Sequence, residues 1–549
     1  MMKHRLVAVF AVLILLMGSG ACRKENKSAL SPSQEGKVYE PEYGDTLIEG
    51  SIGDASTLLP HIASDSASHE IADLIYNGLV RYNKDLIIEG VLADSWKVSE
   101  DGLTITFNLR KNVKWHDGVP FTSKDVMFTY KLMIDPKTPT AYSGDFLRVK
   151  KAEAPDDYTF KVTYDKPFAP ALITWSTWIL PAHLLEGKDI SNVEFGRNPV
   201  GTGPYKFKEW KTGEKIVIVS NNDYFEGRPY ISRVIYRIIP DNQTMFLELQ
   251  AGGVDEMGLT PLQYSRQTDT PPFRNNFQKF RYPSFGYTFL GFNLKDEKFK
   301  DKKIRHAISY AVNKKEIIDG VNLSLATESV GPYRSDMWAN NPNVNKYPYN
   351  PEKSKLLFAE AGWKDSDGDG LLEKNGKKFE FTIITNQGNS MRARTAEIIQ
   401  KNLKDVGINV KIRIVEWAAF LKDFIHKKNF EAIILGWSIP IEPDLYDVWH
   451  SSKTGPDELN FISFSNPEVD KLLEAGRSTF NLEERKKAYG RIQEILADEQ
   501  PYVFLFVPDS LPAISARFKN IKPEPAGINY NFIKWFVPKE LQKFTEMTP

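Results

Sequence analysis

The composition describes a globular chain that is too long for a single core. It has 549 residues, of which 41% are hydrophobic and 26% are charged, and chains beyond roughly 250–300 residues divide into several cores. The 71 basic side chains balance the 71 acidic ones, which removes the electrostatic case for binding nucleic acid or an anionic membrane surface. We therefore expect two or three lobes and no nucleic-acid partner.

The first residues have the pattern of a secretion signal. Lys3 and Arg5 come before an uninterrupted apolar run at residues 6–17, and small residues follow at positions 18–21. The apolar run is too short to cross a hydrocarbon core of about 30 Å as a helix. Residues 1–21 are therefore predicted to be a signal peptide.

Cys22 is the only cysteine of the chain, which excludes an internal disulfide and a metal site built on thiolates. Its place after small residues resembles a bacterial lipobox, in which the cysteine is acylated; the usual Leu of that motif is Ser19 here. The alternative is a chance cysteine beside an ordinary cleavage site. Residues 22–45, being polar, are predicted to be a lipidated cysteine and a flexible tether. We expect an extracytoplasmic lipoprotein, in the periplasm or on the outer face of the cell membrane.

Residues 92–136 combine a hairpin with a helix. Apolar and polar side chains alternate along residues 103–110, as in a strand with one buried face. A Glu-Asp-Gly turn joins this strand to the residues around Trp96, which predicts a β-hairpin. Thr122 is expected to cap the helix, with Asp125 as the acid of a capping box.

The exact order of residue types in this stretch is more specific than its periodicity. Gly-Leu-Thr with Phe-x-Leu-Arg at 102–110, Val-Lys-Trp-His-Asp-Gly at 113–118 and Phe-Thr-x-x-Asp-Val at 121–126 follow one another. The run resembles the peptide class of solute-binding proteins of bacterial ABC importers, which takes dipeptides, oligopeptides or nickel. The resemblance covers roughly residues 47–537. It implies an α/β fold, a two-lobed clamp of the periplasmic-binding-protein type with an extra subdomain in the first lobe.

The resemblance also places the lobes along the chain. Residues 46–288 are expected to form the first lobe, with the extra subdomain at about 80–200. Residues 289–507 are expected to form the second lobe, and residues 508–549 to return to the first. In the second lobe, the strand–helix–strand order within residues 380–415 favours a parallel sheet.

Candidate ligand-binding residues stand at strand ends. Residues 430–437 are nearly all apolar and predict a buried strand, and ligands of α/β sheets bind beyond the carboxyl ends of such strands. Trp437 and Ser438 end this strand. Trp417, at another strand end, and Tyr287, at the crossing between lobes, are candidate aromatic walls, with core packing as the alternative.

The loop after Trp437 departs from the family pattern. In peptide-binding relatives this loop carries an Asp that pairs with the α-ammonium of the ligand, and here that position falls near Pro440. Glu442 and Asp444 remain as candidates, and Asp444 also fits a turn. The departure is compatible with a larger oligopeptide held mainly through its backbone and with a non-peptide ligand.

An Asp-Ser-Asp-Gly-Asp-Gly run begins at Asp365 and matches the front half of an EF-hand calcium loop. Its twelfth position is Gly376 instead of Glu, and a strand follows where a helix should. We favour the alternative, an Asp/Gly hairpin tip on the surface, and expect no cofactor. The candidate calcium ligands are Asp365, Asp367, Asp369 and Glu373.

The chain is predicted to be a receptor and not an enzyme. None of its 8 histidines has the H-E-x-x-H spacing, and no Gly-x-Ser-x-Gly motif occurs. A phosphate loop at Gly201 and Gly203 is rejected, since a strand follows instead of a helix. The resemblance implies a substrate-binding lipoprotein, expected to be a monomer, that captures oligopeptides between its lobes and delivers them to an ABC permease. The alternatives are a nickel or other non-peptide receptor of the same fold, a surface-anchored hydrolase, and a sensor or adhesin.

Overall fold

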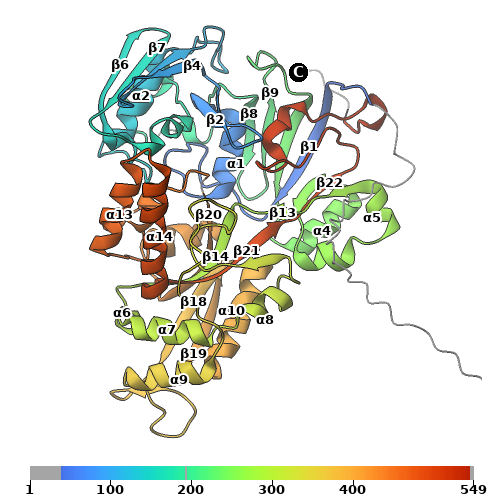
Figure 1. The fold of residues 1–549 in the computed structure, drawn as a ribbon. Helices are drawn as coiled ribbons and strands as arrows, with labels where there is room; N and C mark the ends of the chain where they lie inside the picture. Colours follow the sequence, from blue (N-terminus) through green and yellow to red (C-terminus); the bar gives the residue numbers. More distant parts are fainter. Residues whose placement is uncertain (1–38, 192–193, 440, 545–549) are drawn as a thin grey trace, which may run out of the picture.

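The frame of the molecule consists of two large mixed sheets and a smaller third core (Figure 1). The computed structural model describes residues 39–191, 194–439 and 441–544. The predicted signal peptide, Cys22 and most of the tether lie outside the described residues.

The first sheet has the strand order β12-β22-β11-β1-β10-β9-β8. At its centre, β1 (Gly44–Ser51) pairs in parallel with β10 (Ile231–Ile238) and β11 (Glu256–Gly258). We call the part of the chain built on this sheet lobe I. Its other strands and helices are β8 (Tyr205–Lys211), β9 (Lys215–Ser220), β12 (Phe277–Lys279), β22 (Pro512–Ser515), α1 (Ser66–Ile75), α3 (Ala182–Leu185), α4 (Asn242–Ala251) and α5 (Pro271–Asn276).

The second sheet has the order β13-β21-β14-β20-β18-β19, with β15 added on β21, and carries lobe II. The strand–helix–strand prediction is confirmed, because β18 (Glu380–Asn386) and β19 (Asn409–Val415) are parallel and joined through α10 (Ser390–Lys404). The other strands are β13 (Tyr282–Pro283), β14 (Gly286–Phe292), β15 (Ala326–Glu328), β20 (Ala432–Ser438) and β21 (Tyr502–Ser510), with the small hairpin β16 (Glu373–Lys374) and β17 (Lys377–Lys378) at the edge of the lobe.

Helices cover both faces of the second sheet. Successive side chains of β14 point to opposite faces of the sheet. Phe289 packs into one core with α13 and α14, and Leu290 packs into the other with α7, α9 and α10. The pattern of residues 302–318 favours one helix, but the structure divides it because the Asn313 side chain accepts from the N–H of Glu316 and starts a new helix. The remaining helices are α6 (Glu297–Lys300), α7 (Lys302–Ala311), α8 (Lys314–Gly320), α9 (Pro351–Glu360), α11 (Trp417–Ala419), α12 (Tyr446–Trp449), α13 (Pro467–Arg477) and α14 (Leu482–Glu499).

A third core lies beside the first sheet and contains the predicted hairpin. Its sheet has the order β4-β5-β7-β6, and Trp175 packs at its centre against Phe107 and Phe160, with ring centroids 6.0 and 4.7 Å away. The capping box of Thr122 and Asp125 is confirmed. The elements are β2 (Val80–Tyr82), β3 (Ile88–Gly90), β4 (Ala93–Val98), β5 (Thr104–Leu109), β6 (Val149–Asp156), β7 (Thr159–Tyr164) and α2 (Ser123–Ile134).

The glycines at 201 and 203 make room for helix α1. A Cβ on Gly201 would fall 1.8 Å from the carbonyl oxygen of Ile75, and one on Gly203 would fall 2.5 Å from that of Leu74. Only glycine permits this approach of two backbones. The Gly-x-Gly pattern therefore has a packing reason at the end of α1.

Two segments cross between the sheets and pair with each other along their length. β12, β13 and β14 lead from lobe I to lobe II, and β21 and β22 lead back. β22 pairs antiparallel with β12, and β21 with both β13 and β14. We call these paired strands the crossing ribbon (Figure 1). The lobe boundaries drawn near residues 288 and 507 stay a prediction, since the ribbon contributes to both sheets.

Arg517 joins the C-terminal segment to the first strand of lobe I. Its Nη2 donates to Asp255 Oδ2 at 2.7 Å and to the carbonyl oxygen of Thr46 at 2.7 Å, and its Nη1 pairs with Asp45. All three charged side chains are buried. Breaking such a group by removing one partner leaves an uncompensated buried charge.

No helix in the described part of the chain has both the length and the apolar character needed to cross a membrane.

We predict that Arg517→Met destabilises lobe I by about 3–5 kcal/mol, because two buried carboxylates lose their cation. Urea unfolding followed by circular dichroism measures the change. Arg491→Met is the control, since Arg491 forms ion pairs at the surface with Glu468 and Glu494 and is half exposed; its unfolding midpoint should stay near that of the unaltered protein. Equal midpoints for both variants would contradict the role given to Arg517.

Candidate ligand-binding site

A cavity of about 770 Å³ lies between the two lobes. Lobe I contributes His61, His69 and Trp178, the third core contributes Tyr142, and lobe II contributes residues at the ends of its central strands, such as Trp437. Cavities of roughly 300–1,000 Å³ are usual for enclosed ligands. The position between two separately packed lobes makes this cavity the candidate site.

The structure brings all six predicted ligand-binding residues to the cavity wall. β20 ends at Trp437 and Ser438, and the antiparallel pairing with β14 sets Tyr287 directly beside Trp437. Tyr287 is only 3% exposed. These residues, whose contact with a ligand stays a prediction, are Tyr287, Trp417, Trp437, Ser438, Glu442 and Asp444.

The two tryptophans are held in different ways. The Trp437 ring stacks on Phe461 with centroids 5.4 Å apart, and its Nε1 donates to the Tyr502 hydroxyl at 3.2 Å. Trp417 packs towards the other lobe, since a Cβ on Gly53 would lie 3.3 Å from its Cδ1. Trp437 is therefore fixed within lobe II, whereas the surroundings of Trp417 depend on both lobes.

The predicted acidic residues already have cationic partners. Glu442 pairs with Arg485, and Asp444 pairs with Arg477 at 2.7 Å. Burial raises the pKa of Glu442, and it raises the pKa of Asp444 to about 6 although Arg477 opposes this shift. Asp444 also accepts from the N–H of Tyr446 at 3.0 Å, so the predicted turn role is confirmed. A ligand ammonium at either carboxylate would compete with an arginine. Pro440 lies outside the described residues.

Arg477 connects the two sides of the cavity. Besides Asp444 of lobe II, its Nη2 pairs with Asp145 of the third core, and its guanidinium lies 4.2 Å from the centroid of the Tyr446 ring. A neighbouring pair joins Arg148 to Glu474 across the same gap at 2.7 Å. The lobes therefore meet through complementary charges.

Burial disfavours the charged form of both histidines in the lobe I wall. Burial lowers the pKa of His61 to about 3 and also lowers the pKa of His69. The His69 ring lies 4.9 Å from the ring of Trp178, and Nδ1 of His61 has no hydrogen-bond partner. This wall offers flat rings and neutral nitrogen atoms to a ligand.

Sequence reasoning missed this wall and also Arg392. The side chains of lobe I come from loops and short helices without a strand-end pattern, so no local signal marks them. Arg392 does have a signal, because it follows the carboxyl end of β18 in the first turn of α10. The strand-end rule that selected Trp437 applies equally to that position.

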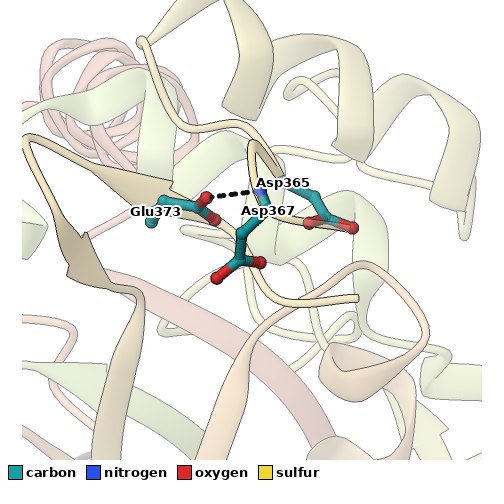
Figure 2. A group of neighbouring side chains, drawn as sticks. All are labelled: Asp365, Asp367 and Glu373. Atoms are coloured by element: carbon teal, nitrogen blue, oxygen red, sulfur yellow. Dashed lines mark hydrogen bonds between the residues drawn. The ribbon is translucent and has the colours of Figure 1, made fainter. Parts of the chain in front are cut away.

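The candidate calcium residues lie outside the cavity: the three aspartates are in the loop before β16, and Glu373 is the first residue of that strand (Figure 2 shows Asp365, Asp367 and Glu373). Carboxylate oxygens of Asp365, Asp367 and Glu373 lie within 4.8 Å of one another. However, Asp365 accepts from the N–H groups of Gly368 and Gly370, at 2.8 and 3.0 Å, which holds the turn without a metal.

The fourth candidate calcium ligand already has a cation beside it, since the ammonium of Lys378 pairs with Asp369. Glu373 accepts from the N–H groups of Ser366 and Asp367 at 2.7 and 3.1 Å. These contacts fit the hairpin-tip interpretation, and a calcium site stays a prediction.

Comparison with known proteins identifies the family of this fold. Residues 88–458 match the family model described as bacterial extracellular solute-binding proteins, family 5 Middle. Over 548 residues the chain is 35% identical to the oligopeptide-binding protein AppA of Bacillus subtilis (strain 168), which covers 98% of this chain and 99% of the relative.

Two solved structures show the same architecture. The oligopeptide-binding protein AppA from Bacillus subtilis in complex with a nonapeptide superposes with a TM-score of 0.87 at 35% identity, over 91% of this chain and 100% of that one. NikZ from Campylobacter jejuni in complex with Ni(L-His) superposes with a TM-score of 0.82 at 31% identity, over 90% of this chain and 99% of that one. The same fold thus holds a peptide in one relative and a nickel complex in the other, so the fold alone does not determine the ligand.

We predict that Arg477→Met shifts the chain towards an open arrangement. The closed form would lose roughly 3 kcal/mol, enough to change a two-state population about 100-fold, because Asp145 and Asp444 would face each other without a cation. Small-angle X-ray scattering should show a larger radius of gyration than for the unaltered protein. The control Arg491→Met removes an arginine from the neighbouring helix and should leave the radius unchanged; an unchanged radius for both variants would refute the bridging role.

Proposed function

Because the chain belongs to the bacterial extracellular solute-binding proteins of family 5, we propose that it is the substrate-binding subunit of an ABC importer and that its ligands are oligopeptides. The observation that carries this proposal is the cavity enclosed by both lobes, with aromatic side chains on each wall. The similarity over nearly the whole chain to a protein whose structure holds a nonapeptide supports the peptide assignment. We propose no catalytic role for the chain.

The clamp would act by closing on its ligand. A ligand can shift the lobes towards the closed form only by as much as it prefers that form. The pair between Arg477 and Asp145 exists only when the lobes meet, so it adds to closure. The crossing ribbon supplies the bend between two rigid bodies, as in hinged binding proteins. Delivery to a membrane permease follows from recognition of the closed form.

A receptor for a metal chelate is the second candidate. It is favoured by the likeness to NikZ and by His61 and His69 in the cavity wall, with the unpartnered Nδ1 of His61. Against it, the described residues bring three metal-ligating side chains together only at Asp365, Asp367 and Glu373, outside the cavity. We therefore place peptides first.

The family is extracellular, and we propose that this member is a monomer held at the membrane through acylated Cys22. The lone cysteine after small residues supports the anchor, because two or three acyl chains anchor a protein stably where a single chain does not. The polar tether that follows would let the folded lobes stand away from the lipid.

We predict that Cys22→Ala releases the protein from the membrane. Fractionation of the producing cells should move the variant to the soluble or culture fraction, because the acylation site is lost, while the unaltered protein stays with the membranes. Mass spectrometry of the N-terminal peptide should show a diacylated or triacylated cysteine. Membrane retention of the variant, or an unmodified cysteine, would disprove the anchor.

Native mass spectrometry of the protein from residue 23 onward, purified gently from its own host, tests the ligand. We expect bound masses that resolve into peptides of mixed composition, because a receptor that grips the backbone tolerates many side chains. After unfolding and refolding to remove the ligand, added peptide pools should raise the melting temperature. A single non-peptide mass, or a nickel chelate, would replace the peptide assignment; no stabilisation by any pool would end it.

A further inference from the structure

A buried row across the sheet of lobe I carries two glutamates and a tyrosine. Glu49 of β1 pairs with Tyr236 of β10 on one side and with Glu256 of β11 on the other. Residues that pair across neighbouring strands point to the same face of the sheet, and Tyr236 belongs to the core that packs this face against α1. The row continues on its two sides with Ile216 and Ile514, which are fully buried. An apolar row is therefore interrupted by two carboxyl groups.

Helix α1 brings a third carboxyl group to the same place. Glu70 of α1 shares a side-chain hydrogen bond with Glu49. Burial raises the pKa of Glu256, and the charge of Glu70 raises it further, so these two carboxyl groups also face each other. We call Glu49, Glu70 and Glu256 the glutamate cluster.

The protein itself supplies no cation to this cluster. In the part of the chain that the structure describes, no lysine or arginine forms an ion pair with any of its three members. Glu256 is 8% exposed and Tyr236 is 4% exposed, yet neither the carboxyl group of Glu256 nor the hydroxyl group of Tyr236 forms a hydrogen bond with another described residue. Burial raises the pKa of Tyr236 and the three glutamates raise it further, which places its hydroxyl group towards the cluster. Buried polar groups normally have a partner.

The glutamate cluster lies next to the ligand cavity along α1. His69, the residue before Glu70, lines the cavity. Asp73, one helical turn after His69, accepts from Nε1 of Trp178 at 2.9 Å, and Trp178 lines the cavity as well. Glu70 and Asp73 are both exposed, so a long side chain of a bound ligand can approach the cluster along this side of the helix.

The spacing of the cluster suits an organic cation better than a single metal ion. Among the described residues, three side chains bring metal-ligating oxygens within 4.8 Å of one another only at Asp365, Asp367 and Glu373. The oxygens of the glutamate cluster are therefore more widely spaced. A guanidinium group spreads five N–H donors over a plane and can contact several carboxylates at once.

We infer that the glutamate cluster binds a basic side chain of the peptide ligand, with arginine preferred over lysine. A carboxyl group that is buried without a cation binds a proton instead, and burial raises the pKa of both Glu49 and Glu256 accordingly. A guanidinium group would take the place of these protons, which pass to the solvent. The inference rests on the proposed peptide function and adds to it the chemistry of one ligand side chain.

The test uses three pools of nonapeptides that are randomised with uncharged side chains. Each peptide of the first pool contains one arginine, each of the second one lysine, and each of the third one citrulline, which has the shape of arginine without its charge. The pools have distinct isotopic labels, and an equal mixture is incubated with the protein from residue 23 onward after its own ligand has been removed. Captured peptides are eluted and quantified by mass spectrometry.

The unaltered protein should capture the arginine pool about 10- to 100-fold better than the citrulline pool, the range expected for hydrogen bonds between charged groups. The lysine pool should lie between them, because an ammonium group makes a more localised contact. Glu256→Gln should abolish the preference and still capture citrulline peptides. The matched control is Glu214→Gln, which removes the same charge from the turn between β8 and β9, where the side chain is 64% exposed; it should keep the preference.

A second measurement separates binding from a structural role. Without peptide, Glu256→Gln should melt at the same temperature as the unaltered protein or above it, because an amide has no charge to remove from water. A structural role would lower the melting temperature and leave the ratio of arginine to citrulline unchanged. Should Glu256→Gln not fold, Glu70→Gln takes its place, since the side chain of Glu70 is exposed, and it should also reduce the preference.

The remaining outcomes each reject a different statement. Equal capture of the arginine and citrulline pools by the unaltered protein overturns the inference and leaves the peptide function standing. A preference that persists in both Glu256→Gln and Glu70→Gln excludes the glutamate cluster as its cause, and a lysine pool captured above the arginine pool contradicts the guanidinium assignment. Capture of no pool at all rejects the peptide function, and the inference with it.

Discussion

The crossing ribbon is the constraint on which the rest of the molecule depends. Its strands pair with each other between the lobes and also belong to both sheets, so the lobes cannot separate without breaking backbone hydrogen bonds. They can only bend about the ribbon. Tyr287 lies on the ribbon and Trp437 on the adjacent strand, which keeps this part of the cavity wall constant. The pair of Arg477 with Asp145, in contrast, joins the two sides of the cavity outside the ribbon and would break if the lobes moved apart.

Local chemistry made part of this structure predictable. The hairpin of β4 and β5, the cap at Thr122 and the end of β20 at Trp437 follow from alternation, turn residues and strand-end rules within short segments. The aromatic wall around His61 and Trp178 could not be predicted, because these two residues lie more than 100 positions apart in the chain and meet through loops. The place of Arg392 in the cavity wall could not be predicted either, because its contact with Gly436 of β20 joins two segments that are distant in the sequence.

The cavity uses its arginines in two different ways. Arg477 is neutralised by the protein and serves the contact between lobes, whereas Arg392 has neutral neighbours and faces the ligand space. The distinction depends on the partners of each arginine and not on the arginine itself. The partners of a charged side chain therefore decide whether its charge is left for a ligand to neutralise.

The position of Arg517 sets an order for the folding of the chain. Asp45 is the second residue of β1, the central strand of lobe I, but its cation comes from the C-terminal segment, 472 residues later. Lobe II has all strands of its sheet between residues 282 and 510. A chain that emerges from its N-terminus therefore completes the sheet of lobe II before that of lobe I: β1 already has its strand partners β10 and β11, but β22 and Arg517 come last. Contacts between segments so far apart in the sequence form slowly. We therefore expect an incompletely folded lobe I to be the state that is exposed to chaperones and proteases.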